Sequence, residues 1–299
     1  MLKGYMYSFL STIFFALPTV FLVLAYKDNL TPNSLILNQS LIAAILIFIY
    51  IKATGQKLPK LTRSNLIDFI LTGAIGKAGT TIALFYAINY MSVSLVMTIV
   101  FMYPAIIIVL EYVFDKQKIS LLQLWGLLII FLGETLVMKV FQGEFYSLSL
   151  KGVALSLTAS IAFGWMLYWT NKKLNTFEPV IVTGYTTFFC TICLLVLMPP
   201  VYLFTDKMTL PLIMWSLFFA ITTSVLANLF LFASVKYIGA ARSSIISILE
   251  LPLTVLFAFL LLKEHMDIVQ ILGTTLIFLG ICFFNWKNSS YFKPESHSI

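Results

Sequence analysis

The sequence predicts an all-helical membrane protein with ten transmembrane helices, and three observations carry that prediction. Of the 299 residues, 60% are hydrophobic and only 10% are charged, whereas about a quarter of an ordinary soluble domain is charged. Ten apolar segments have about the length that a helix needs to cross a bilayer. Short polar breaks such as Lys27-Asp28-Asn29 and Asn171-Lys172-Lys173 separate the segments.

The ten segments leave no room for a folded domain outside the membrane. Their expected ranges are 4–26, 33–51, 66–88, 92–114, 121–138, 152–170, 180–203, 211–233, 241–262 and 268–286. The longest connection, between the second and third segments, has only about fourteen residues. The composition excludes soluble enzymes, nucleic-acid-binding modules and secreted disulfide scaffolds. A Gly-rich phosphate loop followed by Lys and Ser/Thr does not occur, so the chain does not hydrolyse ATP, and we expect no cofactor and no nucleic-acid partner.

The basic residues predict that both termini face the cytoplasm of the plasma membrane, most simply that of a bacterium. Cytoplasmic loops of membrane proteins are enriched in Lys and Arg. With the N-terminus inside, thirteen of the 19 basic residues fall on the cytoplasmic side and five on the outer side, and Lys77 remains within a segment. The outer five are Lys27, Lys139, Lys151, Lys207 and Lys263.

The chain also contains an internal repeat. The pattern Gly4-x3-Ser8-x3-Thr12 recurs as Gly152-x3-Ser156-x3-Ser160 at an offset of 148, and Pro104 pairs with Pro252 at the same offset. Phe85 and Tyr90 recur as Phe232 and Tyr237 at an offset of 147. At the same offset, Gly126 with Phe131-Leu132-Gly133 recurs as Gly273 with Phe278-Leu279-Gly280.

Each half therefore holds five segments, over 1–146 and 147–299. Because five is odd, the second half must enter the membrane from the opposite side, which makes the two halves inverted repeats. In secondary transporters such repeats place the substrate site near the bilayer midplane, between the halves.

The stretch from Tyr237-Ile-Gly-Ala-Ala-Arg-Ser-Ser to Glu250, continued from Thr254 to Lys263-Glu264, resembles the ninth helix of EamA-type members of the drug/metabolite transporter superfamily. This resemblance covers nearly the whole chain. It implies a ten-helix bundle around a central cavity lined by helices one to four and six to nine, with helices five and ten at the periphery and available for packing or a homodimer. One departure stands out, because the family has Glu directly before Pro and here Leu251 separates Glu250 from Pro252.

Lys77 is the clearest candidate for substrate binding. A charge within a membrane segment is costly, so a retained charge indicates a cavity or a partner. Lys77 lies beside a Gly73/Gly76/Gly79 stripe that allows another helix to approach closely. A structural cation and an anion-binding charge are both compatible with this position. The repeat mates of Lys77 and Thr81 are Ser224 and Asn228, which form a polar patch at matching depth and favour the cavity.

Glu250 belongs to a polar stripe on the ninth segment. The stripe contains Ser243, Ser247, Glu250 and Thr254, which helical spacing places on one face. Facing a wet cavity, Glu250 either pairs with Lys77 or titrates during transport. The competing interpretation is hydrogen bonding between helices with a protonated Glu250.

The remaining polar and aromatic candidates carry open alternatives. Asn38 and Gln39 either line the path or join helices. Trp165, Tyr168 and Trp169 form an aromatic face that either stacks on a substrate or belongs to the interfacial aromatic belt. We expect structural roles for four further residues, namely Glu111, Glu134, Cys190 and Cys193, and the two cysteines lack the partners of a metal site.

Together these features predict a secondary active transporter, an exporter or exchanger, for a small organic metabolite such as an amino acid or drug-like solute. The alternative is a lipid-handling membrane protein, either a flippase or scramblase or a prenyl-lipid enzyme. Such an enzyme needs clustered acids or His for its chemistry, and the twelve acids are scattered along the chain.

Overall fold

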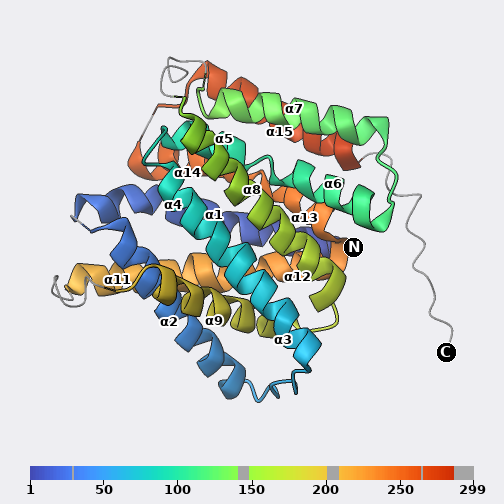
Figure 1. Ribbon diagram of the computed structural model, residues 1–299. Coiled ribbons are helices and arrows are strands. Elements are labelled where there is room, and N and C mark those ends of the chain that lie inside the picture. The colour runs from blue at the N-terminus through green and yellow to red at the C-terminus, as the bar shows by residue number, and fades with distance from the viewer. Residues whose placement is uncertain (29, 141–147, 201–208, 264, 286–299) are drawn as a thin grey trace.

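The computed structural model describes residues 1–28, 30–140, 148–200, 209–263 and 265–285, and this part of the chain is helical throughout its regular structure. Nine helices or helix runs there are long and apolar enough to span a membrane, and the shorter apolar helix α7 adds a tenth (Figure 1). We number these ten spans in chain order. They are α1 (Leu2–Lys27); α2 (Pro32–Ala53); α3 (Arg63–Ile70) with η1 (Leu71–Ala78) and α4 (Gly79–Ala87); α5 (Val93–Val100) with α6 (Tyr103–Asp115); α7 (Leu121–Val137); α8 (Leu150–Trp169) with η3 (Thr170–Leu174); α9 (Pro179–Leu197); α11 (Leu210–Phe219) with η4 (Ala220–Ala227) and α12 (Asn228–Ile238); α13 (Ala240–Ser247) with α14 (Glu250–Leu262); and α15 (Ile268–Asn285).

Most of the predicted segments match these spans to within a few residues, and two predicted ends are wrong. The seventh span ends at Leu197 rather than at 203, because Pro199 and Pro200 lack the N–H groups that would continue the helix. Pro199 therefore lies beyond a helix and does not kink one. The eighth span continues to Ile238 rather than ending at 233, and Gly239 then terminates it with a positive φ of 85°.

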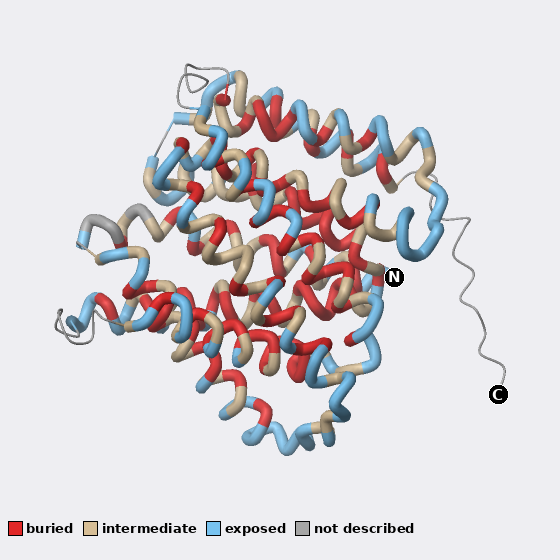
Figure 2. Tube along the Cα trace, in the orientation of Figure 1, coloured by how far each residue is buried: buried red, intermediate tan, exposed pale blue. Residues whose placement is uncertain are grey.

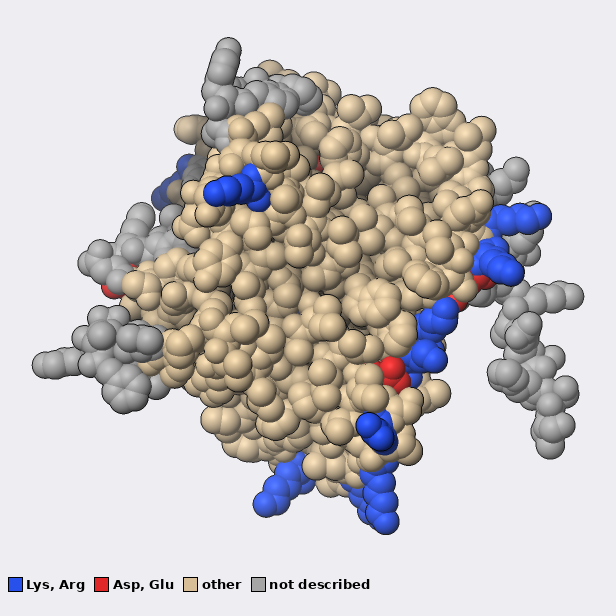
Figure 3. Space-filling model, viewed as in Figure 1, with Lys and Arg blue, Asp and Glu red and all other residues tan. Residues whose placement is uncertain are grey.

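The ends of the bundle differ in charge. We call the end that carries the N-terminus and the α2–α3, α6–α7, η3–α9 and α12–α13 connections the inner end, and the opposite end the outer end. Figure 3 shows most of the visible Lys and Arg side chains along the lower right edge, on the side where the N-terminus lies in Figure 1. The side chains of Lys27 and Lys207 lie outside the described part.

Eight of the ten spans form a closed ring. Going round the ring, α2 contacts α9, α9 contacts η1, the third span contacts α8, α8 contacts α6, α6 contacts α13, α14 contacts α1, α1 contacts α12, and η4 returns to α2. Spans five and ten stay outside the ring and pack against each other, at the top of Figure 1. This arrangement matches the peripheral place that the family resemblance gives to them.

Glycine contacts between α7 and α15 obey the repeat symmetry. A Cβ atom at Gly133 would lie 2.7 Å from the carbonyl oxygen of Gly273, and one at Gly273 would lie 2.7 Å from that of Gly133. The second contact joins Gly126 to Gly280 in the same reciprocal way, at 3.0 and 2.8 Å. Replacing each residue by its mate at offset 147 turns the first contact into the second, because Gly133 corresponds to Gly280 and Gly273 to Gly126. This exchange places a pseudo-twofold axis between the two helices, as inverted repeats require.

Irregular backbone occurs at matching places in both repeats. The fourth span is broken between Val100 and Tyr103, and the ninth between Ser247 and Glu250. Each break lies just before a proline of the repeat pair Pro104 and Pro252, whose rings prevent a regular ladder of hydrogen bonds. The third and eighth spans each contain a π-helical segment of 8 residues, η1 and η4. Short π-helical segments often lie at functional sites.

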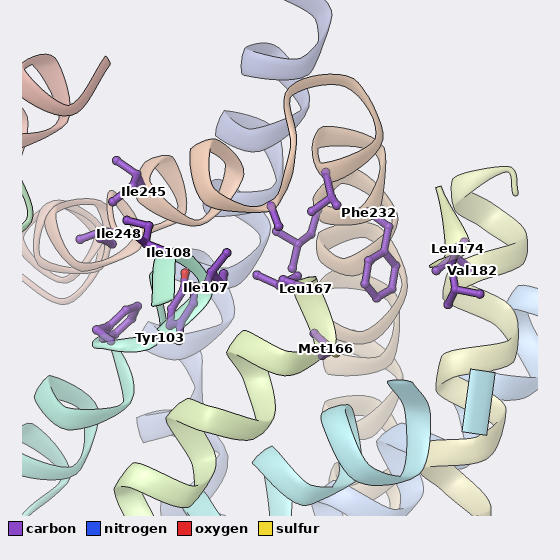
Figure 4. Close-up of a cluster of buried hydrophobic side chains, with 14 of the residues drawn as sticks. Tyr103, Ile107, Ile108, Met166, Leu167, Leu174, Val182, Phe232, Ile245 and Ile248 are labelled. Carbon is purple, nitrogen blue, oxygen red and sulfur yellow. The ribbon is translucent and has the colours of Figure 1, made fainter. Parts of the chain in front are cut away.

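The two ends of the ring also differ in packing. The largest buried apolar cluster lies mainly in the inner half and draws on both repeats (Figure 4). In that view Tyr103, Ile107 and Ile108 lie beside Ile245 and Ile248. In the outer half the buried apolar residues form two separate clusters, one on α2, α9 and α11 and the other on α4, α5 and α8. Figure 2 shows the buried residues concentrated in the middle of the bundle. The inner half is therefore packed as one unit and the outer half as two.

Candidate functional site

Polar contacts join each neighbouring pair of spans on the side of the ring around α2 and α9. Ser40 Oγ lies 2.6 Å from Thr191 Oγ1 between α2 and α9, and Thr80 Oγ1 approaches the Ala159 carbonyl at 3.4 Å between the third and sixth spans. The repeat mate of the Thr80 contact is the bond that Ser11 Oγ donates to the Ala227 carbonyl at 2.8 Å. Interhelical bonds of this kind hold spans together where no hydrophobic force acts between them.

Two of these contacts form a symmetric pair at mid-span, and they contain the main predicted residues. Lys77 Nζ of η1 donates to Thr187 Oγ1 of α9 at 2.9 Å. Gln39 Nε2 of α2 donates to Ser224 Oγ of η4 at 2.8 Å. Ser224 is the mate of Lys77 at offset 147, and Thr187 is the mate of Gln39 at offset 148. We call these four residues the mid-span pairs.

Thr187 was not identified from the sequence. It lies in an apolar segment among other threonines, and no local pattern separates it from them. The one usable signal is its repeat relation to Gln39, a residue that did stand out. The predicted close approach at the glycine stripe is confirmed, because a Cβ at Gly73 would lie 2.6 Å from the Thr186 carbonyl and one at Gly76 would lie 2.7 Å from Met166.

Three other predicted residues lie next to the mid-span pairs along the chain. Thr81 donates to the Lys77 carbonyl at 3.0 Å, one turn along the third span. Asn228, the first residue of α12, donates to the Thr223 carbonyl at 2.8 Å and so satisfies a carbonyl of the π-helical segment. Asn38 is buried beside Gln39 on α2. The polar atoms of Thr81 and Asn228 therefore support the backbone around the mid-span pairs.

Glu250 lies on the opposite side of the ring, at the break of the ninth span. It is the first residue of α14, and its carbonyl accepts a bond from Thr254 Oγ1 at 2.8 Å. Ser247 donates to the Ser243 carbonyl at 3.0 Å, and Tyr103 of the fourth span donates to the Ser244 carbonyl at 3.4 Å. Pro252, two positions after Glu250, accompanies this helix break. The Leu251 that separates the two residues has therefore not removed the break.

Lys77 and Glu250 do not form an ion pair in this conformation. The ion pairs among the described residues, with nitrogen and oxygen within 4.0 Å, join Lys139 to Asp267, Lys172 to Asp115 and Lys236 to Glu178. The first lies at the outer end, between α7 and the residue before α15. The other two lie at the inner end, where Lys172 joins the sixth span to the fourth and Lys236 joins the eighth to the start of α9.

The predicted aromatic face lies towards the inner end of α8. Trp165 and Trp169 stack with ring centroids 4.6 Å apart. Trp169 Nε1 donates to Asp68 Oδ1 of α3 at 3.0 Å, and Tyr168 accepts a bond from Lys172 at 2.6 Å. These contacts place the polar atoms of the face at helix junctions near the bundle end.

Glu134 lies away from the mid-span pairs and Cys193 lies in a packing contact, whereas Cys190 is buried on α9 near Lys77. Glu134 is 1% exposed on α7, and its Oε1 has no hydrogen-bond partner among the described residues. Cys193 Sγ lies 3.7 Å from the Ala74 carbonyl, which fits the predicted packing face. Within the described ranges, no three His, Cys, Asp or Glu side chains lie together in a way that would hold a metal ion.

Surface cavities lie near both ends of the bundle. Two at the inner end have volumes of about 360 and 310 Å³ and share Lys236 and Tyr237. One in the outer half has a volume of about 410 Å³ and is lined by Thr254, Lys139 and Gln270 among others. A fourth, of about 540 Å³, is an open apolar groove between α2 and α9, lined by Ile45, Phe48 and Phe188 among others.

A ring of membrane spans from two inverted repeats, with broken helices and polar contacts at mid-span, defines a membrane transporter. The comparison with known families agrees. The chain belongs to the EamA-like transporter family, whose domain matches residues 2–139 and again 150–286. The duplication predicted from the offsets and the family resemblance are thereby confirmed, and the alternative of a prenyl-lipid enzyme is set aside because this is a family of transporters.

Individual relatives cover most of the chain. One is "uncharacterized transporter YyaM" of Bacillus subtilis strain 168, 28% identical over 81% of this chain and 80% of the relative. Another is an "uncharacterized transporter" of Clostridium kluyveri, 23% identical over 94% and 92% of the two chains. A solved crystal structure has a similar fold, with a TM-score of 0.76 at 12% identity over 94% of this chain and 97% of the other.

Proposed function

We propose that the protein is a secondary active transporter that moves a small organic metabolite, such as an amino acid or drug-like solute, by alternating access. The mid-span pairs are the observation that carries this proposal. Each pair joins one repeat to the other, and the two pairs are related by the repeat offsets and lie beside the π-helical segments η1 and η4. Inverted-repeat transporters bind their substrates near the midplane, between the repeats. The transporter works as an exporter or exchanger, driven by protons or by a counter-transported solute.

The difference between the two ends supports alternating access. One continuous apolar cluster and two ion pairs close the inner end, whereas the outer half is divided between two clusters. In this proposal the described conformer is closed at the inner end. Transport then requires an exchange in which the outer half closes and the inner cluster separates.

The proposed substrate site lies inside the ring, in the central cavity that the family resemblance implies. Its members beside the mid-span pairs are Lys77, Thr81, Ser224, Asn228 and Asn38. Across the ring are Ser247, Glu250 and Thr254, where a broken helix leaves backbone groups available to a solute. Trp165 and Trp169 contribute from the inner side.

Several finer features belong to the same proposal. The repeat boundary lies between residues 146 and 147. The inner end faces the cytoplasm of the plasma membrane, since Lys and Arg gather there.

A homodimer forms through the outward faces of α7 and α15, which expose large apolar side chains such as Trp125 and Phe278. Cross-linking in native membranes would detect that dimer, and its absence would restrict these faces to lipid.

Cysteine labelling tests alternating access without knowledge of the substrate. In a chain with Cys190, Cys193 and Cys282 replaced by Ala, Thr254→Cys would report on the outer cavity and Ile107→Cys on the inner cluster. We expect both to react with maleimides over time, and a bulky maleimide placed first at Thr254→Cys to slow the reaction at Ile107→Cys. Lys151→Cys, at an exposed outer position, is the control for reagent access.

Equal labelling of Ile107→Cys with and without the bulky group would contradict alternating access, and so would a complete lack of reaction at both positions.

The competing function, movement of lipids between leaflets, has the apolar groove between α2 and α9 in its favour. Vesicles that contain fluorescent lipid and the purified protein would separate the two, because only a scramblase or flippase makes inner-leaflet lipid accessible to an external quencher.

A further inference from the structure

Lys77 has an unusual environment for a cation within a membrane span. An ammonium group has three N–H donors, and the one bond it makes to described residues uses the Thr187 hydroxyl. No carboxylate of the described residues lies within 4.0 Å of its Nζ atom, since the three ion pairs involve other lysines. The side chain is also only partly buried. Among the described residues, no carboxylate therefore supplies a counter-charge to Lys77 at ion-pair distance.

The acids of neighbouring spans do not supply that counter-charge. Asp68 accepts a bond from Trp169 at the inner end of the third span. Glu134 lies in the α7–α15 interface, outside the ring. Glu250 lies at the break of the ninth span, and the contacts around the ring place that span away from α9. A cation held for structural reasons alone is normally paired, because an unpaired charge away from water is strongly destabilising.

The repeat mate shows that the helix contact needs no charge. Gln39 and Ser224 join α2 to η4 at 2.8 Å with neutral groups, and this contact is the symmetry-related counterpart of the contact between Lys77 and Thr187. Both pairs bridge the same kind of interface, so a neutral pair is sufficient for packing. The positive charge of Lys77 therefore has a purpose other than joining the third span to the seventh.

Thr187 differs from the other threonines of α9 in a way that suits a ligand. Thr183, Thr186 and Thr191 each donate to the carbonyl four residues earlier, at 2.8, 2.6 and 2.8 Å. The Thr187 hydroxyl accepts from Lys77 and has no acceptor among the described residues for its own hydrogen. An anion next to Lys77 would supply that acceptor, and charge-assisted bonds of this kind are the strong ones.

We propose that Lys77 and Thr187 form a subsite for a carboxylate of the transported solute, and that Gln39 and Ser224 bind a neutral polar group of the same solute. One ammonium and one hydroxyl match a single negative charge better than a phosphate dianion, which generally meets more donors. This inference rests on the proposed transport function and names the substrate class for it: small organic monocarboxylates.

Matched pairs of acids and amides test the subsite. Benzoate, nicotinate, indole-3-acetate and succinamate would each be compared with the neutral amide of the same skeleton, in thermal-stability titrations of the purified full-length protein. A ligand that binds the folded form raises its apparent stability. We expect at least one carboxylate to stabilise the protein while its amide does not. Lys77→Met should weaken this binding at least tenfold, and Lys77→Arg should keep it within about fivefold because it keeps the charge.

Lys151→Met is the matched control, since it removes a cation from an exposed outer position and should leave the titration unchanged. Equal stabilisation by acid and amide, unchanged carboxylate binding in Lys77→Met, or no response to any of the four carboxylates would each overturn the subsite. Failure here with successful cysteine labelling would reject the carboxylate and keep the transporter, whereas failure of the labelling would reject alternating access itself.

Discussion

The α7–α15 interface and the mid-span pairs arise from the same internal duplication, yet the residues of the two halves are still identical in the first and have diverged in the second. Between α7 and α15 the four glycines are identical in both halves, and their close contacts are reciprocal to within a few tenths of an ångström. At mid-span the geometry is reciprocal while the residues are not, since Lys77 corresponds to Ser224 and Thr187 to Gln39.

The comparison separates packing from chemistry. Where two helix backbones lie in contact, only glycine leaves enough room, and so neither half can change. Where a long polar side chain reaches a short hydroxyl, several residue types fit the same space. The asymmetric charge at mid-span is therefore free to serve a ligand, which the symmetric glycines cannot do.

The largest expected effect comes from filling the symmetric interface. Gly133→Val would bring a side chain within 2.7 Å of the Gly273 carbonyl and 2.8 Å of Ile277, and overpacking of this kind costs about 1–3 kcal/mol or more. The thermal unfolding midpoint in detergent should fall steeply, and Gly273→Val should cause a similar fall. Gly79→Ala, where the nearest atom is 3.6 Å away, should be tolerated; a larger loss there would break the comparison.

The second prediction makes the mid-span pairs identical. The double variant Lys77→Ser with Thr187→Gln makes both mid-span contacts between the repeats neutral Gln–Ser contacts. The unfolding midpoint should stay close to that of the unaltered protein, because Gln39 and Ser224 already join their helices with these groups. Discrimination between carboxylate and amide should be lost. Unfolding of this variant would show that the charge is structural after all.

A third, smaller effect is expected at the inner end. Lys172 contacts Asp115 and Tyr168, whereas the repeat mates of Lys172 and Asp115 at offset 148 are Leu24 and Lys263, which have no opposite charges to pair. An exposed ion pair contributes about 0.2–1 kcal/mol. Asp115→Asn should therefore raise the labelling rate of Ile107→Cys between about one and a half and fivefold. A slower rate would mean that the pair does not hold the inner end closed.

The smallest effect is expected at Trp169. Its bond to Asp68 corresponds, in the other repeat, to a contact between Phe21 and Trp215 with ring centroids 6.4 Å apart. A phenyl ring therefore occupies the equivalent position already. Trp169→Phe should lower the stability by about 1 kcal/mol, the value of one hydrogen bond, and leave carboxylate binding within twofold. A tenfold loss of binding would instead show that the substrate depends on the indole N–H of Trp169 and not only on an aromatic ring at this position.

Much of the fold could be predicted from the sequence, because lipid imposes simple constraints on it. An apolar stretch of fixed length must be a helix there, since every backbone group has to bond within its own segment. The exceptions were local. The end of the seventh span at Leu197 and the breaks at Val100–Tyr103 and Ser247–Glu250 depend on how individual prolines are accommodated.

The candidate site was predictable only in part. Lys77 and Glu250 stand out in the sequence because each is a charge among apolar residues. Their direct pairing was one possible consequence, and the structure places them on different sides of the ring without an ion pair. Which polar residue meets which depends on the order of spans around the ring, and the periodicity of a single helix carries no information about that order.

By itself the sequence determined the membrane environment, the ten spans and the duplication, because hydrophobic length and repeat offset are properties of the linear chain. The tertiary structure decided that Lys77 meets Thr187 and Gln39 meets Ser224, residues 110 and 185 positions apart. It also decided that the apolar core is continuous at one end and divided at the other. The physical reason is that side-chain contacts across a ring form only when distant helices pack together, and that packing is a property of the whole bundle.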